Sequence, residues 1–167
     1  MSSKELFSTE QLVSVRTALD EFEQHKLEFH HPAIVVHGLT GIWGTEEPLP
    51  RESEAASYVR EAPADQRVYR APRQVAKAAD WDLGLSSEFR RAIRGIDRKL
   101  QGRVLQAIDY ISTKPTVAQG DTVTPLGGDL KGLWRYRIGD YRLLYRPDSQ
   151  NQRVVLVTFV SRGGAYE

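Results

Sequence analysis

Apolar residues near the start of the chain recur with helical spacing. Four of them fall three or four residues apart and so share one face of an amphipathic helix: Leu12, Val15, Leu19 and Phe22. Ser8 and Gln11 have the spacing of a capping box, in which each side chain bonds the other residue's backbone N–H. We therefore predict a helix over about residues 9–28.

A short β-branched run follows at residues 33–37 (Ala-Ile-Val-Val-His). Pro32 and Gly38 bound this run, which predicts a strand or an extended segment. The next stretch, residues 41–79, holds four prolines and few large apolar side chains, which is typical of a connector. We expect one short helix within it, around residues 52–60.

The second half of the chain begins with a strand and two helices. Residues 81–85 alternate apolar and other side chains, as a half-buried strand does, and Ser86 and Ser87 offer N-caps for a helix that carries Phe89 and Ile93. A second helix, capped by Asp97, ends before Pro115 and has an apolar stripe made of Leu100, Val104, Ile108 and Ile111. Together these two helices predict a helical hairpin.

Three short β-rich runs separated by tight turns complete the pattern: residues 133–138, 141–146 and 154–160. Gly139-Asp140 and the polar segment 148–151 form the turns, so the runs predict an antiparallel meander. We expect an α+β fold in which the helical hairpin packs on one face of this small β-meander sheet. The expected organisation is an N-terminal extension, residues 1–79, followed by a domain at residues 80–167.

Composition and charge exclude several classes of protein and indicate the kind of partner. Hydrophobic residues make up 40% and charged residues 27% of the chain, near globular averages, which excludes collagen-like, wholly disordered and membrane-embedded proteins. The net charge is +1, yet residues 1–79 carry nine basic and twelve acidic residues, whereas residues 80–167 carry fourteen and ten. Residues 131–146 alone hold five basic residues and one acid. This distribution indicates a polyanionic partner for the second part of the chain.

Several site classes and locations are disfavoured. The chain has no cysteine, which excludes disulfides, thiolate catalysis and cysteine zinc sites. Its four histidines are not spaced to chelate from one helix face, so we expect neither a metal nor another cofactor. No apolar run approaches the roughly 18 residues of a membrane span, and the start lacks a signal-peptide core. We expect a cytoplasmic protein with no membrane partner.

The basic residues follow the period of the predicted strands. Arg135 and Arg137 are two residues apart and so leave the same face of the first meander strand, with Arg142 across the turn. Alternation turns Trp134 and Tyr136 toward the helices. Like charges in cross-strand register cost stability, so three guanidiniums on one exposed face indicate an anionic ligand.

The C-terminal half resembles the RelE/ParE superfamily of bacterial toxins. The resemblance is carried by LGGDLKGLWRYRIGDYRLLYR at residues 126–146 and RVVLVTFVSRGGAY at residues 153–166. It implies a RelE-like, ribosome-dependent endoribonuclease that cleaves messenger RNA and is neutralised by a cognate antitoxin. ParE-like members share the fold but poison DNA gyrase.

The resemblance implies a catalytic site made of Arg135, Arg137, Arg142, Arg162 and Tyr166. The expected RNA-binding residues are Lys131, Arg135, Arg137 and Arg146. Many relatives have a histidine before the C-terminal arginine, where this chain has Ser161. A relative's use of that histidine as acid or base therefore does not transfer.

The chemistry of RNA cleavage leads to the same residues. Attack by the 2′-OH requires its deprotonation, neutralisation of charge on the phosphorane and protonation of the leaving 5′-oxygen. Because the C-terminal half has no histidine, Tyr166 is the expected proton-transfer group. Its ordinary pKa is about 10, so Arg142 and Arg162 are expected to stabilise the phenolate. The guanidiniums are poor proton donors and are assigned to phosphate binding.

Two other functions stay open, and both bear on the extension. One is a ParE-like gyrase inhibitor, favoured if Arg162 and Tyr166 are dispensable. The other is a catalytically silent RNA- or partner-binding module, favoured if the acidic extension permanently covers the arginine face. The apolar stripe of the extension requires burial, so we predict that it packs on the domain, against the helical hairpin. An extension that docks away from the arginines is a structural addition, whereas an extension that lies over them is an inhibitor.

Overall fold

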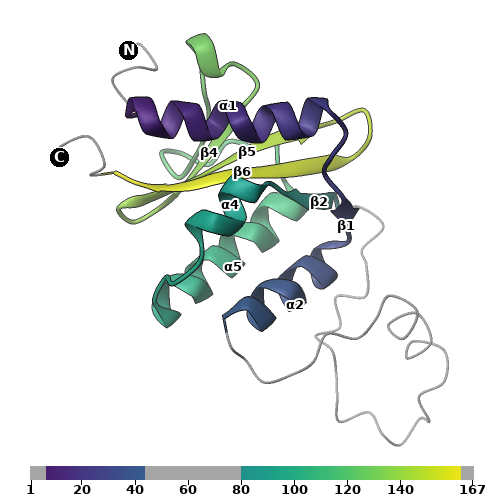
Figure 1. Ribbon diagram of the computed structural model, residues 1–167, viewed down its shortest axis with the longest axis vertical. Coiled ribbons are helices and arrows are strands. Elements are labelled where there is room, and N and C mark those ends of the chain that lie inside the picture. Colours follow the sequence, from purple (N-terminus) through teal and green to yellow (C-terminus); the bar gives the residue numbers. More distant parts are fainter. Residues whose placement is uncertain (1–6, 44–79, 163–167) are drawn as a thin grey trace, which may run out of the picture.

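Three consecutive strands form an antiparallel meander at the predicted positions (Figure 1). The strands are β4 (Trp134–Ile138), β5 (Tyr141–Asp148) and β6 (Arg153–Ser161). The computed structural model that shows them describes residues 7–43 and 80–162. Gly139 turns β4 into β5 with a φ of 63°, a left-handed conformation that favours glycine. The predicted meander is therefore confirmed.

Three further strands extend the meander into a six-stranded sheet: β1 (Phe29–His30), β2 (Asp82–Leu85) and β3 (Val123–Pro125). The order is β1-β2-β6-β5-β4-β3, with β2 and β6 parallel and all other neighbours antiparallel. The strand predicted at residues 81–85 is confirmed as β2. Strands β1 and β3 were not predicted, because two or three residues are too few to show alternation.

The helical hairpin is also confirmed. Its helices are α4 (Ser87–Ala92) and α5 (Arg98–Thr113), capped by Ser86 and Asp97 as predicted. Ser86 Oγ accepts a hydrogen bond from the Phe89 N–H at 2.9 Å. A short 3-10 helix, η2 (Gly128–Leu130), precedes β4.

Helices cover both faces of the sheet, which creates two cores (Figure 1). The first core joins α2, α4 and α5 to one face and includes Leu83, Phe89, Ile108, Leu143 and Leu156. The second core joins α1 to the other face and includes Val15, Ala18, Leu144, Val155 and Val157. Because β6 contributes to both cores, its residues 154–159 are buried on both faces.

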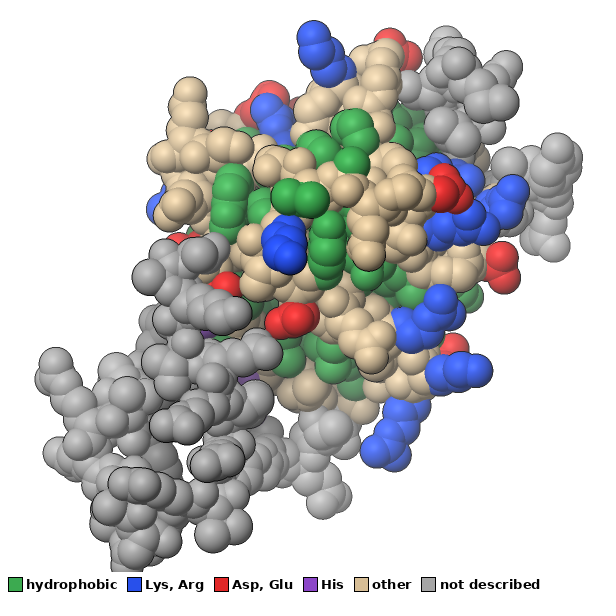
Figure 2. Space-filling view, turned by 180° about the vertical axis from the view of Figure 1, so that it is seen from behind, with side chains coloured by type: hydrophobic (Ala, Val, Ile, Leu, Met, Phe, Trp, Pro, Cys, Tyr) green, Lys and Arg blue, Asp and Glu red, His purple; other side chains and the backbone are tan. Residues whose placement is uncertain are grey.

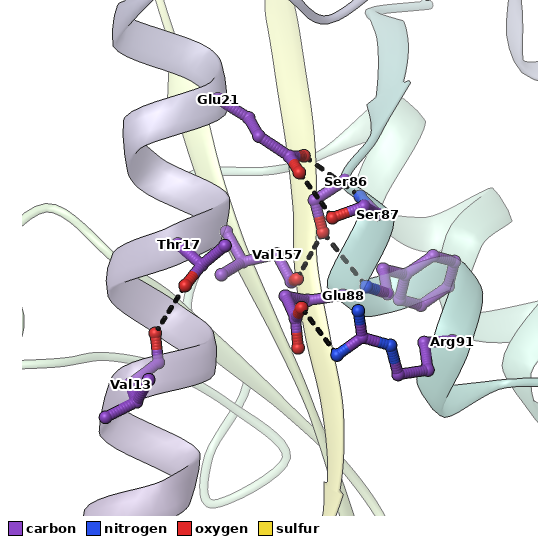
Figure 3. A network of polar contacts seen from close by, with 9 residues as sticks. Val13, Thr17, Glu21, Ser86, Ser87, Glu88, Arg91 and Val157 are labelled. Atoms are coloured by element: carbon purple, nitrogen blue, oxygen red, sulfur yellow. Dashed lines mark hydrogen bonds and ion pairs between the residues drawn. The ribbon is translucent and has the colours of Figure 1, made fainter.

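A β-bulge in β6 changes which face its side chains reach. Between Leu144 and Tyr145 the pairing with β6 shifts by one residue, which leaves Val157 as the extra residue. Ser86 Oγ donates to the Val157 carbonyl at 2.5 Å (Figure 3). One hydroxyl therefore caps α4 and satisfies a carbonyl at the bulge.

The first helix, α1 (Thr9–Glu23), begins with the predicted capping box. Ser8 Oγ accepts from the Gln11 N–H at 3.2 Å, and Gln11 Oε1 accepts from the Ser8 N–H at 3.0 Å. The predicted end at residue 28 is wrong, because Gln24 is the C-cap and His25 has a left-handed φ of 53°. The left-handed conformation of His25 ends the helix and directs the chain toward β1.

The apolar stripe of α1 packs on the sheet rather than on the hairpin alone. Its residues join the second core against β5 and β6, while α4 lies along its flank. Glu21 on α1 accepts hydrogen bonds from the N–H and hydroxyl of Ser87 at the start of α4 (Figure 3). Gln11 donates to the carbonyl of Ser161 at 3.3 Å. The predicted contact between extension and domain is confirmed, mainly on the sheet.

The strand predicted at residues 33–37 is wrong, because these residues lie in helix α2 (Pro32–Ile42). Pro32 occupies the first turn, where its missing N–H costs nothing, and the Nδ1 atom of His31 accepts from the Ala33 N–H at 3.2 Å. Val35 and Leu39, four residues apart, are buried against the first core. The connector predicted at residues 41–79 begins too early, because α2 continues to Ile42. Residues 44–79, with the helix predicted at 52–60, lie outside the described residues.

The burial of α1 predicts a difference between two valines on the same helix. Val15 is fully buried, whereas Val13 is 56% exposed. Val15→Ala should lower the free energy of unfolding by about 2 kcal/mol more than Val13→Ala, because it leaves a cavity between α1 and the sheet. The shared helix cancels the change in helix propensity. Urea denaturation of the full chain measures both values, and equal losses would show that α1 is not part of the cooperative fold.

Candidate anion-binding site

Three predicted site arginines share one sheet face. Arg137 on β4 pairs directly with Arg142 on β5, and Arg135 pairs with Leu144, whose side chain belongs to the second core. Trp134 and Tyr136 alternate to the other face and pack against the first core. The predicted facing of these residues is therefore confirmed.

This face is not fully exposed, contrary to our expectation. The Arg135 side chain is only 15% exposed, while that of Arg137 is 44% exposed. Helix α1 packs on the same face of the sheet, and the guanidinium of Arg142 lies 5.6 Å from the ring centre of Phe7, just before α1. The extension thus borders the arginines.

One carboxylate connects the two β4 arginines. Asp121 Oδ1 lies 3.1 Å from Arg135 Nη2, and Asp121 Oδ2 bonds Arg137 Nη1. The hydrogen bond from Arg137 and the charge of Arg135 hold the pKa of Asp121 below its ordinary value. Asp121 was not predicted, because its position depends on the pairing of β3, a strand that was not predicted either, with β4. The local sequence does not single it out, since Asp129 lies closer to the arginines along the chain.

Arg162 joins the same cluster from the end of β6. Its backbone N–H donates to the carbonyl of Asp140 in the β4–β5 turn at 2.5 Å. The pKa of Arg142 is lowered, first by desolvation and then by the positive charges of Arg135, Arg162 and Arg137. These four residues, which we call the arginine cluster, therefore interact electrostatically.

The remaining predicted site residues lie apart from the cluster or cannot be placed. Arg146 is four residues beyond Arg142 on β5, and its guanidinium lies 3.8 Å from a Glu23 carboxylate oxygen and 5.1 Å from the Phe22 ring centre. It therefore contacts the end of α1. Lys131 follows η2 with an exposed side chain. Tyr166 lies outside the described residues.

Figure 2 shows Lys and Arg side chains gathered along one side of the molecule, with a few acidic side chains among them. Within residues 7–43 and 80–162, no group of three or more histidine, aspartate or glutamate side chains could hold a metal ion. Over the same ranges no helix is long and apolar enough to cross a membrane.

The cluster predicts selective anion binding. The other three arginines of the cluster lie close enough to Arg142 for their charges to act on it, so a multivalent anion should bind and stabilise the fold by mass action. Millimolar pyrophosphate should raise the melting temperature of the protein more than sodium chloride at equal ionic strength. Arg137→Ala should reduce this rise, whereas Arg16→Ala, which removes an exposed charge from α1, should not. An equal reduction in both variants would indicate general screening instead.

Comparisons with known proteins found a matching family model and similar solved structures. Residues 81–166 match the family model described as the ParE toxin of type II toxin–antitoxin systems, parDE. The RelBE2 complex from Mycobacterium tuberculosis contains a similar chain with 24% identity, covering 49% of this chain and 98% of that one, at a TM-score of 0.43. The archaeal RelE–RelB complex from Pyrococcus horikoshii OT3 contains a similar chain with 25% identity. The match covers 48% of this chain and 93% of that one, at a TM-score of 0.42.

A third structure, the YoeB/ParE toxin from Agrobacterium tumefaciens, has 21% identity, covering 47% of this chain and 95% of that one, at a TM-score of 0.40. No curated protein matches the chain. The family model spans more than half of the 167 residues, from the residue before β2 to beyond β6. The chain therefore belongs to the ParE toxin family of type II toxin–antitoxin systems, within the RelE/ParE superfamily.

Proposed function

We propose that this chain is a RelE-like toxin that cleaves messenger RNA on the ribosome and is neutralised by a cognate antitoxin. The arginine cluster is the observation that supports this proposal best. Arg137 and Arg142 stand directly opposite each other on neighbouring strands, so an anion that binds between or beside them lessens their repulsion. The phosphates of RNA supply such an anion at every nucleotide.

The chemical class of the side chains suits a phosphate in particular. A guanidinium offers planar, paired N–H donors that match two phosphate oxygens, and it stays charged throughout the physiological range. Guanidiniums aimed at one phosphate also stabilise the extra charge that develops when a 2′-oxygen attacks it. In this proposal Arg135, Arg137, Arg142 and Arg162 bind the scissile phosphate and its transition state.

Proton transfer needs a different group. All four histidines lie at the other edge of the sheet, on β1, on α2 or in the segments next to them, and three strands separate β1 from β4. No histidine can therefore reach the arginine cluster, and we assign proton transfer to Tyr166. A tyrosine with an ordinary pKa of about 10 is a weak base at neutral pH. This weakness is consistent with a toxin that depends on the ribosome to align its substrate.

The antitoxin follows from the family. A type II toxin is by definition encoded with a protein that neutralises it, and the matching family model is named for such a system. The same name favours a second function, inhibition of DNA gyrase, in which the arginine cluster contacts a protein or DNA and performs no chemistry.

Mapping of message ends decides between these functions. A defined transcript is translated in a purified system with the full chain, and its 5′ ends are mapped by primer extension. Discrete cuts support the RNase. An intact message together with trapped gyrase cleavage complexes supports the second function, and inactivity in both assays supports a silent binding module.

Arg137→Ala should lower the cleavage rate by about 10²-fold, because one donor to the transition-state charge is lost. It should also reduce the salt dependence of RNA binding by roughly one charge. Arg16→Ala serves as the control for net charge. An equal effect of both substitutions on cleavage would argue against a localised site.

Tyr166→Phe tests the proton-transfer assignment separately. Removal of the phenolic hydroxyl should lower the cleavage rate by roughly 10²-fold and leave ribosome binding unchanged, because the ring itself is retained. Single-turnover cleavage and ribosome co-sedimentation measure the two quantities. Unchanged cleavage would remove Tyr166 from the reaction.

A further inference from the structure

Asp121 occupies the space between the two guanidiniums of β4. Each of its carboxylate oxygens contacts one arginine: Oδ1 contacts Arg135 and Oδ2 contacts Arg137. A phosphate held by the same two arginines would use two oxygens in the same way. The carboxylate and a substrate phosphate thus require the same donors.

The backbone of Asp121 is held in place while its side chain remains accessible. The Thr122 carbonyl accepts from the Arg137 N–H at 2.7 Å, and the Thr122 N–H donates to the Gln119 carbonyl at 2.9 Å. The Asp121 side chain itself is 70% exposed. An exposed side chain changes rotamer rapidly, so the carboxylate can leave the arginines without any change in the strands.

The charges also indicate that this carboxylate is a weak occupant. The positive charges of Arg135, Arg162 and Arg137 lower the pKa of Arg142, and the negative charge of Asp121 acts in the opposite direction. Asp121 is ionised at neutral pH like any exposed aspartate, and Arg137 and Arg135 lower its pKa further. The Asp121 carboxylate carries a single negative charge, so a polyanion can replace it at Arg135 and Arg137.

We propose that Asp121 is an internal competitor for the phosphate site, which rests on the proposed function of the arginine cluster in binding RNA. In the free protein Asp121 holds Arg135 and Arg137 in a paired geometry and weakens their binding of stray anions. Bound RNA displaces the carboxylate with a phosphate. Displacement of the carboxylate costs the same free energy for any ligand, but an RNA that contacts the cluster at several points offsets this cost with more contacts than a small anion makes. Asp121 therefore favours a correctly placed RNA over a single small anion.

The alternative is a structural role, in which Asp121 orients the arginines and helps them bind. The two roles predict opposite changes in anion affinity when the charge of Asp121 is removed. Exposed ion pairs contribute little to stability, so neither role requires a large change in the melting temperature.

Asp121→Asn distinguishes these roles, because it retains the shape of the side chain and removes its charge. Asp109→Asn is the matched control, since Asp109 is exposed on α5, which covers the other face of the sheet. Dissociation constants for pyrophosphate and for a short single-stranded RNA are measured at two salt concentrations on the full chain. Asp121→Asn should bind both about tenfold more tightly than wild type at low salt, and Asp109→Asn should bind much like wild type.

A double-mutant cycle adds a second measurement, the dependence of the affinity gain on Arg137, which a structural role would leave unchanged. In an Arg137→Ala background, Asp121→Asn should bring little gain in pyrophosphate affinity, because the competitor has lost its principal partner. Weaker or unchanged anion binding by Asp121→Asn in the wild-type background would overturn the inference, as would an equal gain from Asp109→Asn.

Pyrophosphate binding separates this inference from the proposed function. If the wild type cleaves no message but Asp121→Asn still binds pyrophosphate more tightly, the competitor role holds and the RNase proposal fails. If the wild type cleaves message and Asp121→Asn binds pyrophosphate no more tightly, the proposed function holds and the competitor role fails.

Discussion

Burial of β6 on both faces is the constraint on which the rest of the structure depends. This strand lies between β2 and β5, and its alternating side chains supply the first core on one face and the second core on the other. A strand buried in this way cannot form without cover on both sides. The helices α4 and α1 provide that cover, and both contact β6 directly.

The same constraint fixes the arginine cluster. β5 pairs with β6, and the bulge at Val157 shifts this pairing by one residue, so that Leu144 and Val155 both reach the second core from opposite sides of the bulge. Arg142 and Leu144 are two residues apart on β5 and so share a face, although one belongs to the cluster and the other to the second core. The charged cluster is the exposed end of a face whose other end is apolar.

The elements with long, regular patterns could be predicted from the sequence. Alternation in β4 assigned Arg135 and Trp134 to opposite faces, and the apolar stripes of α1 and α5 predicted burial. The strand predicted at residues 33–37 failed because β-branched residues also occur in buried helices, and the N-cap of α2 is an atypical His31. Asp121 could not be predicted as a site residue from the local pattern, since only the pairing of β3 with β4 brings it to the arginines. Periodicity likewise shows that α1 needs a partner surface but not which surface.

The contact between α1 and β6 also determines when this protein can fold during synthesis. Gln11 and Ser161, which bond each other, are 150 residues apart, and β6 is the last strand of the sheet to leave the ribosome. Until it emerges, β2 and β5 have no strand between them, and α1 lacks β6, one of the two strands that it covers. Closing so long a loop is slow relative to local helix formation. Arg142 and Arg162 can meet only after β6 pairs, so a nascent chain carries the arginines without the cluster.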